Sequence, residues 1–254
     1  ENKAQEYYLP AHMLARSCVY GYRSIRMREY DEYLHVGGRA SGKSSFVPQV
    51  VLEQVINNPD THALVVRKYA NTLRDSVFAQ FKWAISKLDM EHLFKTTVSP
   101  MAITYEPTGQ TIYFRGGDEP EKINSIKPEF GYIAFLWLEE VDQFNGPEDR
   151  RNIEQSALRG GPISLRFKSY NAPKSKHHWI NNYALLPKAN MLVHHSTYLD
   201  IPTEWLGQPF IDEADLLKEL NETAYRNEYL GEVTGQGLNV FDNIAFGLRM
   251  KNVP

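Results

Sequence analysis

The chain has 254 residues, of which 42% are hydrophobic and 23% charged, as expected for a globular protein with one large domain and room for a small appendage. The net charge of −3 excludes the broadly electropositive surface of a protein that coats nucleic acid and allows only a local basic region. The single cysteine, Cys18, excludes an intrachain disulfide, and no apolar stretch approaches the roughly 18 residues of a membrane span.

Apolar runs alternate with helical patterns along the chain, which predicts an α/β fold with a mainly parallel sheet flanked by helices. An N-terminal segment, a core and a C-terminal helical part that leads into a linker are expected at 1–32, 33–210 and 211–254. Strands are predicted at 33–36, 62–67, 131–138, 162–170 and 191–198. Helices are predicted at 45–57, 71–88, 148–158, 176–185 and 212–230. An insertion with the pattern of a β-hairpin interrupts this order at 102–115.

A phosphate-binding loop follows the first strand. Residues 37–44 fit the pattern G-x-x-x-x-G-K-[ST], with an apolar strand before them and a helical run after them. Backbone N–H groups of such a loop face phosphate oxygens, and the helix N-terminus adds partial positive charge. We expect Lys43 to reach the β- and γ-phosphates of ATP and the Ser44 hydroxyl to bind Mg²⁺. The residues expected to bind the nucleotide are Gly37, Gly38, Arg39, Ala40, Ser41, Gly42, Lys43, Ser44 and Ser45.

Arg39 lies inside this loop and has two possible partners. Its guanidinium can reach the γ-phosphate of the same subunit and take part in catalysis. It can equally face solvent or pair with an acid such as Glu140. Both interpretations fit the sequence.

Two glutamates end the most apolar strand. Residues 132–138 form an unbroken apolar run, typical of a strand buried on both faces, and Glu139 and Glu140 follow it. The carboxyl ends of parallel strands are where α/β proteins bind their ligands. We therefore assign Glu139 to the Mg²⁺ ion and Glu140 to the water that attacks the γ-phosphate. Two acids alone would favour a solvated strand end, but the phosphate-binding loop reverses that preference.

Aromatic residues near the N-terminus leave the adenine site open. Tyr7 and Tyr8 can cover an adenine ring, or they can pack on the core. Four arginines between residues 16 and 28 alternate with tyrosines, and a solvated helix face is favoured over contacts with DNA phosphates or a neighbouring subunit. Trp83, at helical spacing from its neighbours, is expected in the core.

Together these motifs resemble the ATPase domain of the large subunit of tailed-phage terminases, which are DNA-packaging motors. The resemblance spans most of the chain and implies a P-loop NTPase fold of the RecA-like (ASCE) class. Ala40 stands where close relatives often have glycine, which is harmless if its φ is negative. Besides the phosphate-binding loop with its arginine, the matching blocks are 66–78, 114–117, 121–123, 137–141, 167–173, 195–200 and 229–232.

The resemblance implies a coupling motif at Ser169, Tyr170 and Asn171, where it suggests that Ser169 and Asn171 sense the γ-phosphate. A serine and an amide are chemically suited to this role. A turn started by Asn-Ala-Pro is an equally good interpretation of the same residues.

Terminases can also supply an arginine to a neighbour's site from just before the acidic strand. Here that stretch holds Lys122 and Lys127, and Arg159, after the acidic strand, is another candidate. The trans-acting residue is therefore left unassigned.

Large terminase subunits generally carry a C-terminal nuclease domain built around several acids. This chain stops about where that domain would begin, with a linker-like stretch at 235–237 and an isolated acid, Asp242. We expect ATP hydrolysis and no nuclease activity from this polypeptide.

The sequence thus predicts a motor that uses ATP and Mg²⁺ to drive double-stranded DNA into a procapsid. The resemblance implies a portal protein and a small terminase subunit as partners, a ring of copies when active, a monomer in isolation, no membrane, and the host cell cytoplasm. One alternative is another P-loop enzyme, such as a helicase-like ATPase or a kinase. The other is a nucleotide-dependent scaffold that does not hydrolyse.

Overall fold

The structure is a computed structural model and describes residues 6–235. Within that range eight strands form one sheet in the order β3-β4-β5-β2-β6-β7-β1-β8. The strands from β5 to β8 in this order are parallel, whereas β3 and β4 are antiparallel to their neighbours. The strands are β1 (Glu32–Gly37), β2 (Thr61–Arg67), β3 (Phe94–Val98), β4 (Met101–Tyr105), β5 (Thr111–Gly116), β6 (Tyr132–Glu139), β7 (Leu165–Asn171) and β8 (Met191–Ser196).

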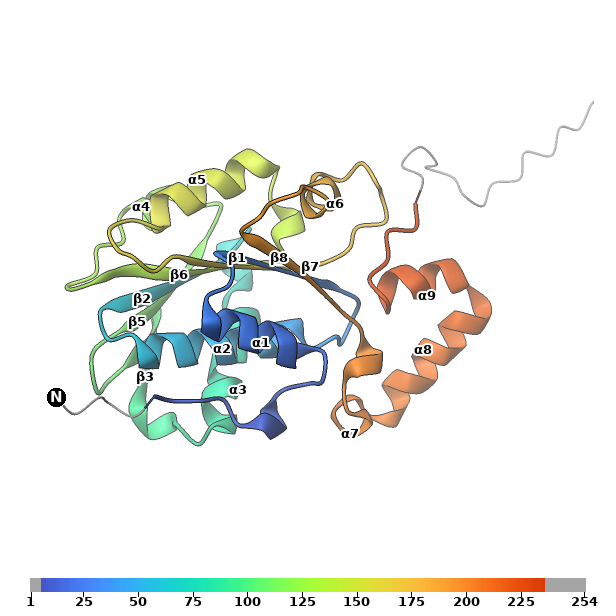
Figure 1. The fold of residues 1–254 in the computed structure, drawn as a ribbon, viewed down its shortest axis with the longest axis horizontal. Coiled ribbons are helices and arrows are strands. Elements are labelled where there is room, and N and C mark those ends of the chain that lie inside the picture. Colours follow the sequence, from blue (N-terminus) through green and yellow to red (C-terminus); the bar gives the residue numbers. More distant parts are fainter. Residues whose placement is uncertain (1–5, 236–254) are drawn as a thin grey trace, which may run out of the picture.

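Helices cover both faces of the sheet, as Figure 1 shows. One face carries α1, α2 and α3, the opposite face carries α4, α5 and α6, and α7, α8 and α9 lie to one side, after β8. None of the described helices is long and apolar enough to span a membrane. The helices are α1 (Cys18–Met27), α2 (Lys43–Asn57), α3 (Ala79–Lys87), α4 (Pro120–Asn124), α5 (Pro147–Ala157), α6 (Trp179–Ala184), α7 (Thr203–Leu206), α8 (Gln208–Leu220) and α9 (Glu222–Glu228).

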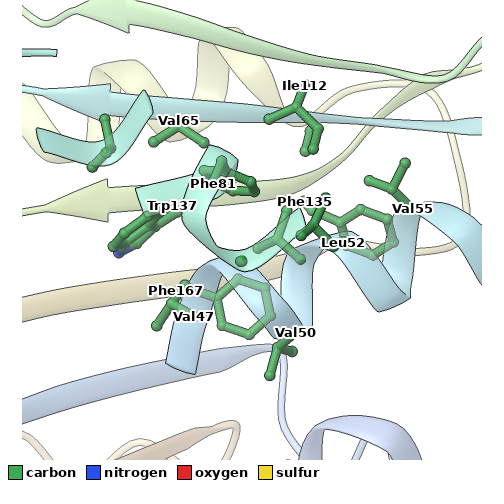
Figure 2. Packing of buried hydrophobic residues seen from close by; sticks show 14 of the residues in the cluster. Val47, Val50, Leu52, Val55, Val65, Phe81, Ile112, Phe135, Trp137 and Phe167 are labelled. Carbon is green, nitrogen blue, oxygen red and sulfur yellow. The ribbon is translucent and has the colours of Figure 1, made fainter. Parts of the chain in front are cut away.

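The core on the α2 side fixes the position of the phosphate-binding loop. Val47 and Val50 of α2 pack toward Phe135, Trp137 and Phe167 of β6 and β7 (Figure 2). All five side chains are fully buried. Each such side chain contributes about 1.5–3 kcal/mol when it leaves water. This packing holds the N-terminus of α2 against the carboxyl ends of the central strands.

The predicted mainly parallel sheet and the hairpin insertion are confirmed, since β4 and β5 pair antiparallel. β3, α1, α4 and α7 are not among the predicted elements. The helix predicted at 212–230 is divided at Asn221, whose side chain accepts a hydrogen bond from the Ala224 N–H at 3.0 Å and so begins α9. The helix predicted at 71–88 opens with a turn of 3₁₀-helix and a turn of π-helix, Arg74–Phe78, before α3.

The prediction that Trp83 belongs to the core is wrong. Phe81, Ala84 and Ile85 form the buried side of α3, whereas Trp83 is 39% exposed. The stripe of α3 that faces the sheet is narrow, so Trp83 falls outside it.

Candidate functional site

Three central strands end at one edge of the sheet and bring the predicted motifs together. β7 lies between β1 and β6, with Gly37 beside Asn171 and Glu139 beside Ser169. The phosphate-binding loop and the acidic strand therefore meet across β7, although about a hundred residues separate them in the chain. The Ser44 hydroxyl lies 3.5 Å from Oε1 of Glu139.

Lys43 is buried at the centre of this edge. Its Nζ donates to the Gly38 carbonyl at 2.9 Å, to the Ser41 hydroxyl at 2.8 Å and to Oδ1 of Asn171 at 3.0 Å. Burial lowers the pKa of the Lys43 amine to about 8, and the nearby charge of Glu139 opposes that shift. Three neutral oxygens thus surround a cation, an arrangement that suits the exchange of these oxygens for those of a phosphate.

Ser44 and Glu139 have the chemistry of a magnesium site. A hydroxyl and a carboxylate oxygen are the hard ligands that Mg²⁺ binds, usually together with phosphate oxygens and waters. The two oxygens of Glu139 face different groups, because Oε2 lies 2.7 Å from Nε of Arg67 while Oε1 faces Ser44. Burial raises the pKa of the Glu139 carboxyl, and the Arg67 charge opposes this. The residues present therefore fit the predicted ion.

Arg67, at the end of β2, forms ion pairs with both acids. Its guanidinium contacts Oε2 of Glu139 and Oε2 of Glu140. Oε2 of Glu140 also accepts a hydrogen bond from the Gln143 amide at 2.7 Å. Glu140 has a φ of 51°, in the left-handed region. Arg67 and Gln143 thus both donate to one oxygen of the Glu140 carboxylate. Sequence reasoning placed Arg67 in a family block but gave it no role, because its partner strand is distant in the chain.

Asp142 is a further acid at this edge that the sequence analysis did not single out. Burial raises the pKa of its carboxyl to about 6, and the charges of Arg67 and Lys43 oppose the shift. The signal available in the sequence was its position two residues after Glu140. Near neutral pH, Asp142 therefore adds negative charge close to Lys43 and Arg67.

The three residues of the predicted coupling motif face different directions. Asn171 contacts Lys43, as described above. Ser169 is buried, and its hydroxyl oxygen accepts from Nε1 of Trp137 at 2.9 Å. Tyr170 packs on the other face of the sheet, with the cluster that contains α5 and α6. Only Asn171 therefore touches the phosphate-binding loop through a side-chain hydrogen bond, and the sensing role itself stays a prediction.

Arg39 does not pair with Glu140. Its guanidinium is 3.2 Å from Oε2 of Glu228, at the end of α9, and its backbone N–H donates to the Glu228 carbonyl at 2.7 Å. A Cβ at Gly38 would lie 2.0 Å from the backbone oxygen of Tyr229, so only glycine fits there. The chain after α9 thus packs directly on the phosphate-binding loop. The Arg39 side chain is 59% exposed, and contact with a γ-phosphate stays a prediction.

The alanine at position 40 would be harmless if its φ were negative, but its φ is positive. Its φ is 51°, in the left-handed region, where a side chain costs about 1–2 kcal/mol. The loop therefore holds a residue in a conformation that glycine adopts without strain. Such strain is tolerated where the surrounding structure fixes the backbone.

Among the described residues, none of the three candidates for a trans-acting role forms an ion pair or a hydrogen bond with Glu139 or Glu140 of this subunit. Lys122, on α4, is exposed and pairs with Glu119. Lys127 precedes β6 and so lies beside its amino end, roughly 23 Å from the Glu139 end of that strand. Arg159 is exposed just after α5, and its Nε donates to the Gln155 carbonyl at 2.8 Å. A role in a neighbouring subunit stays a prediction for each of them.

The N-terminal tyrosines do not cover the phosphate-binding loop. The Tyr7 N–H donates to Asn57 at 2.8 Å, at the C-terminal end of α2, about 20 Å along that helix from Lys43. Tyr8 lies over the Arg26 guanidinium, 3.8 Å from the ring centroid. The interpretation of these tyrosines as an adenine cover is wrong, because the segment runs along α2 away from the loop.

A cavity of about 630 Å³ adjoins the phosphate-binding loop instead. Ala40, Gly42 and Ser45 form its wall on the loop side, and Trp83 and Trp205 contribute aromatic surface. Its volume lies in the range of small-molecule sites, and it is largely apolar with a few polar groups. Sequence reasoning missed this cavity, because it is assembled from the N-terminal segment, α2, α3 and the chain around α7.

A buried ionic cluster supports β7 from the opposite face. Lys168 is 0% exposed, and its Nζ lies 2.6 Å from Oε1 of Glu32 and 2.8 Å from Oε1 of Glu154. Arg150 donates to both oxygens of Glu154, at 2.8 and 2.7 Å. The cluster therefore ties β1, β7 and α5 together one residue before the predicted coupling motif. Asp242 and residues 236–237 of the expected linker lie outside the described residues.

The fold and the site together define a P-loop NTPase, with the predicted RecA-like arrangement of a strand between the phosphate-binding and acidic strands. The sequence model of a family described as phage terminase large subunit (Terminase_3) matches residues 31–232. The chain belongs to this family.

Two relatives show how much of the family's full length the chain represents. The large terminase subunit of Bacillus phage SPP1 is 41% identical over 230 residues, which are 88% of this chain and 54% of that protein. The PBSX phage terminase large subunit of Bacillus subtilis is 25% identical over 223 residues, which are 81% of this chain and 50% of that protein. The chain therefore spans about half the length of the curated relatives it matches.

Solved structures share the fold at low sequence identity. The large terminase of the thermophilic bacteriophage D6E superimposes with a TM-score of 0.68 at 15% identity, covering 86% of this chain and 53% of that one. The ATPase domain of the Thermus phage P74-26 large terminase gives a TM-score of 0.59 at 13% identity, covering 89% of this chain and 94% of that one. The D6E protein has been solved in complex with ATP-gamma-S and with ADP.

Proposed function

We propose that this chain is an ATP-hydrolysing motor domain that drives double-stranded DNA into a viral procapsid. The carrying observation is the approach of Ser44 to Glu139, 3.5 Å apart, beside the buried Lys43. This places a phosphate-binding loop, an acid suited to a metal ion and the second acid, Glu140, at one edge of the sheet. Family membership and the ATP-gamma-S and ADP complexes of the D6E relative support the same function.

Nucleotide binding begins at Lys43. Its amine now donates to three protein oxygens, and the β- and γ-phosphates of ATP would take their place with full negative charge. Backbone N–H groups at the start of α2 add their partial positive charge. The nucleoside leaves the loop on the side of Gly42 and Ser45, which also line the cavity.

Ser44 and Glu139 would hold Mg²⁺. When bound, the ion neutralises charge that develops on the transferred phosphoryl group. The protein's contribution is to present one hydroxyl and one carboxylate oxygen to the same point, with the second carboxylate oxygen kept on Arg67.

Glu140 is the proposed base for the attacking water. Arg67 and Gln143 both donate to the same oxygen, Oε2, so Oε1 is the oxygen that would take the proton. The positive charge of Arg67 beside the carboxylate opposes this proton uptake, and Arg67 is therefore proposed to restrain hydrolysis. Arg39 is proposed to leave Glu228 and stabilise the γ-phosphate in the transition state.

Coupling to DNA is proposed to pass through Asn171. When Lys43 turns to a phosphate, Asn171 loses its hydrogen-bond partner and can sense the γ-phosphate. The next residue, Ala172, accepts a hydrogen bond from Asn227 of α9 at 2.9 Å. Nucleotide turnover at the loop thus has a short route of contacts to α7, α8 and α9, which we propose to move the DNA-gripping surface.

The remaining assignments follow from family membership. We propose a ring of copies in which Lys122, Lys127 or Arg159 approaches a neighbour's nucleotide, with portal protein and the small terminase subunit as partners in the host cytoplasm.

A Glu140→Gln variant tests the proposal. We expect ATP affinity to stay within about threefold, while phosphate release with DNA present falls by about 10²–10⁴-fold, because the amide cannot accept the proton. Glu148→Gln is the matched control, since Glu148 follows on α5 with its side chain 83% exposed and should behave as wild type.

Four results would contradict the proposal. Unchanged phosphate release from Glu140→Gln removes Glu140 from the mechanism. A phosphorylated product in place of free phosphate indicates a kinase. Tight ATP binding without turnover by the wild type indicates a scaffold, and tight Mg²⁺-ATP binding by Lys43→Ala rejects the phosphate role of Lys43.

A further inference from the structure

One long stretch of the chain carries basic residues without any acidic ones. Residues 155–199 contain six lysines and arginines and no aspartate or glutamate, so they contribute a charge of +6 to a chain whose net charge is −3. Such an asymmetry along a chain indicates a region that contacts an anionic partner. Three of the six cations lie close to acids at the start of β1, Asp31 and Glu32, and these three are Arg166, Lys168 and Lys188.

Two of the other cations lie on the loop that joins β7 to α6, residues 172–178 (Figure 1). Lys174 and Lys176 are exposed, and neither forms an ion pair within residues 6–235. The backbone between them is fixed, because Nδ2 of Asn181 donates to the Pro173 and Ser175 carbonyls, each at 2.9 Å. The loop therefore presents two hydrated point charges on flexible stems, which suit the phosphates of a nucleic acid backbone.

This loop is attached both to the nucleotide site and to the C-terminal helices. It begins directly after Asn171, whose side chain lies 3.0 Å from the Lys43 amine. The Ala172 carbonyl accepts from Asn227 of α9, and the Lys174 carbonyl accepts from the N–H of Gly235, after α9, at 2.8 Å. A shift of the end of β7 or of α9 would therefore move the two lysines.

The C-terminal helices themselves do not suit a polyanion. The exposed surface of α8 bears four acids and one lysine, so its negative charge repels DNA phosphates. The acids of this surface are Asp212, Glu213, Asp215 and Glu219.

A second basic surface lies near the N-terminus. Arg16 and Arg23 are exposed there. Among the described residues, neither forms a hydrogen bond or ion pair with the phosphate-binding loop or with the end of β7. A grip on DNA at these arginines would have no direct contact with the nucleotide site, whereas the loop at 172–178 has one through Asn171.

We propose that the loop at 172–178 contacts the phosphate backbone of double-stranded DNA through Lys174 and Lys176. The inference rests on the proposed function of a DNA-translocating motor and gives that motor the place where it holds DNA. Contacts to phosphates carry no sequence information, as a motor that moves along any sequence requires. The attachment to Asn171 makes the grip respond to the state of the nucleotide.

The test measures the affinity of the whole chain for a fluorescent duplex of random sequence by anisotropy, over a series of salt concentrations. Each phosphate contact contributes about 0.9 to the slope of log Kd against log salt concentration. Lys174→Gln/Lys176→Gln should therefore lower this slope by about 2, with unstimulated ATP turnover unchanged. Lys174→Arg/Lys176→Arg keeps both charges and should keep the wild-type slope. Lys82→Gln/Lys218→Gln is the matched control, because it removes two exposed lysines from α3 and α8 and should leave the slope unchanged.

The outcomes separate this inference from the proposed function. A wild-type slope in Lys174→Gln/Lys176→Gln overturns the role of the loop, assigns its lysines to another partner such as an acidic protein surface, and leaves the motor proposal standing. An equal loss in the matched control, or a loss only in Arg16→Gln/Arg23→Gln, also overturns it. The single variants of Lys174 and Lys176, each expected to lower the slope by about 1, give the same comparison if the double variant does not fold. A wild type that binds no DNA rejects the translocating function as well.

Discussion

The amine of Lys43 and Oδ1 of Asn171 are 3.0 Å apart, so the lysine of the phosphate-binding loop is hydrogen-bonded to the last residue of the neighbouring strand. Asn171 is adjacent to Ala172, which contacts α9, and α9 leads to the segment packed on Gly38. The loop, the end of β7 and the C-terminal helices therefore form one continuous set of contacts. If Lys43 changes its hydrogen-bond partners, Asn171, which is predicted to sense the γ-phosphate, loses a hydrogen bond.

The first prediction concerns pH. Burial lowers the pKa of Lys43 to about 8, so the amine loses its proton as the pH rises through that value. Phosphate binding requires the cation, and ATP affinity should therefore fall above pH 8 by up to about tenfold per pH unit. Calorimetry across this range measures it. Lys43→Arg keeps its charge at every pH used and should show no such fall, although it places the charge differently. A wild-type affinity that is constant across pH 8 would contradict the lowered pKa of Lys43.

A second prediction concerns Arg67. Because its guanidinium pairs with Glu140, Arg67→Ala should free the proposed base and raise ATP turnover in the absence of DNA several-fold. The ratio of DNA-stimulated to unstimulated rates should fall accordingly. Arg166→Ala is the control: Arg166 lies near the start of β7, away from this edge, and is 3.9 Å from Asp31. If Arg67→Ala lowers both rates together, Arg67 supports the site rather than restraining it.

The third prediction concerns the ionic cluster beneath β7. Lys168→Met would leave Glu32 and Glu154 buried without their shared cation, and should lower the free energy of unfolding by about 3–5 kcal/mol in urea titrations. Lys122→Met removes an exposed pair with Glu119 and should change it by less than about 1 kcal/mol. Equal stability of the two variants would show that the cluster contributes nothing to holding β7.

Local residue patterns predict many of the strands and helices, and contacts between distant parts of the chain decide the rest. The five parallel strands and the hairpin were predictable because each is a local apolar pattern bounded by turn residues, and Trp83 was misplaced because its local spacing does not reveal which side of α3 meets the sheet. The last predicted helix is divided because Asn221 caps the start of α9. From the sequence, an asparagine that caps a helix cannot be told apart from an asparagine on the surface of a continuous helix.

By itself, the sequence determined the phosphate-binding loop, the acidic strand and the family, because these depend on residue types at short, fixed spacings. Only the tertiary structure decided that Arg67 holds both glutamates, that Arg39 pairs with Glu228, that Ala40 has a positive φ, and that Trp83 and Trp205 line a cavity beside the loop. Ion pairs of this kind join strands and helices that are far apart in the chain. Their partners follow from strand order and from the packing of side chains in three dimensions, on which a local pattern carries no information.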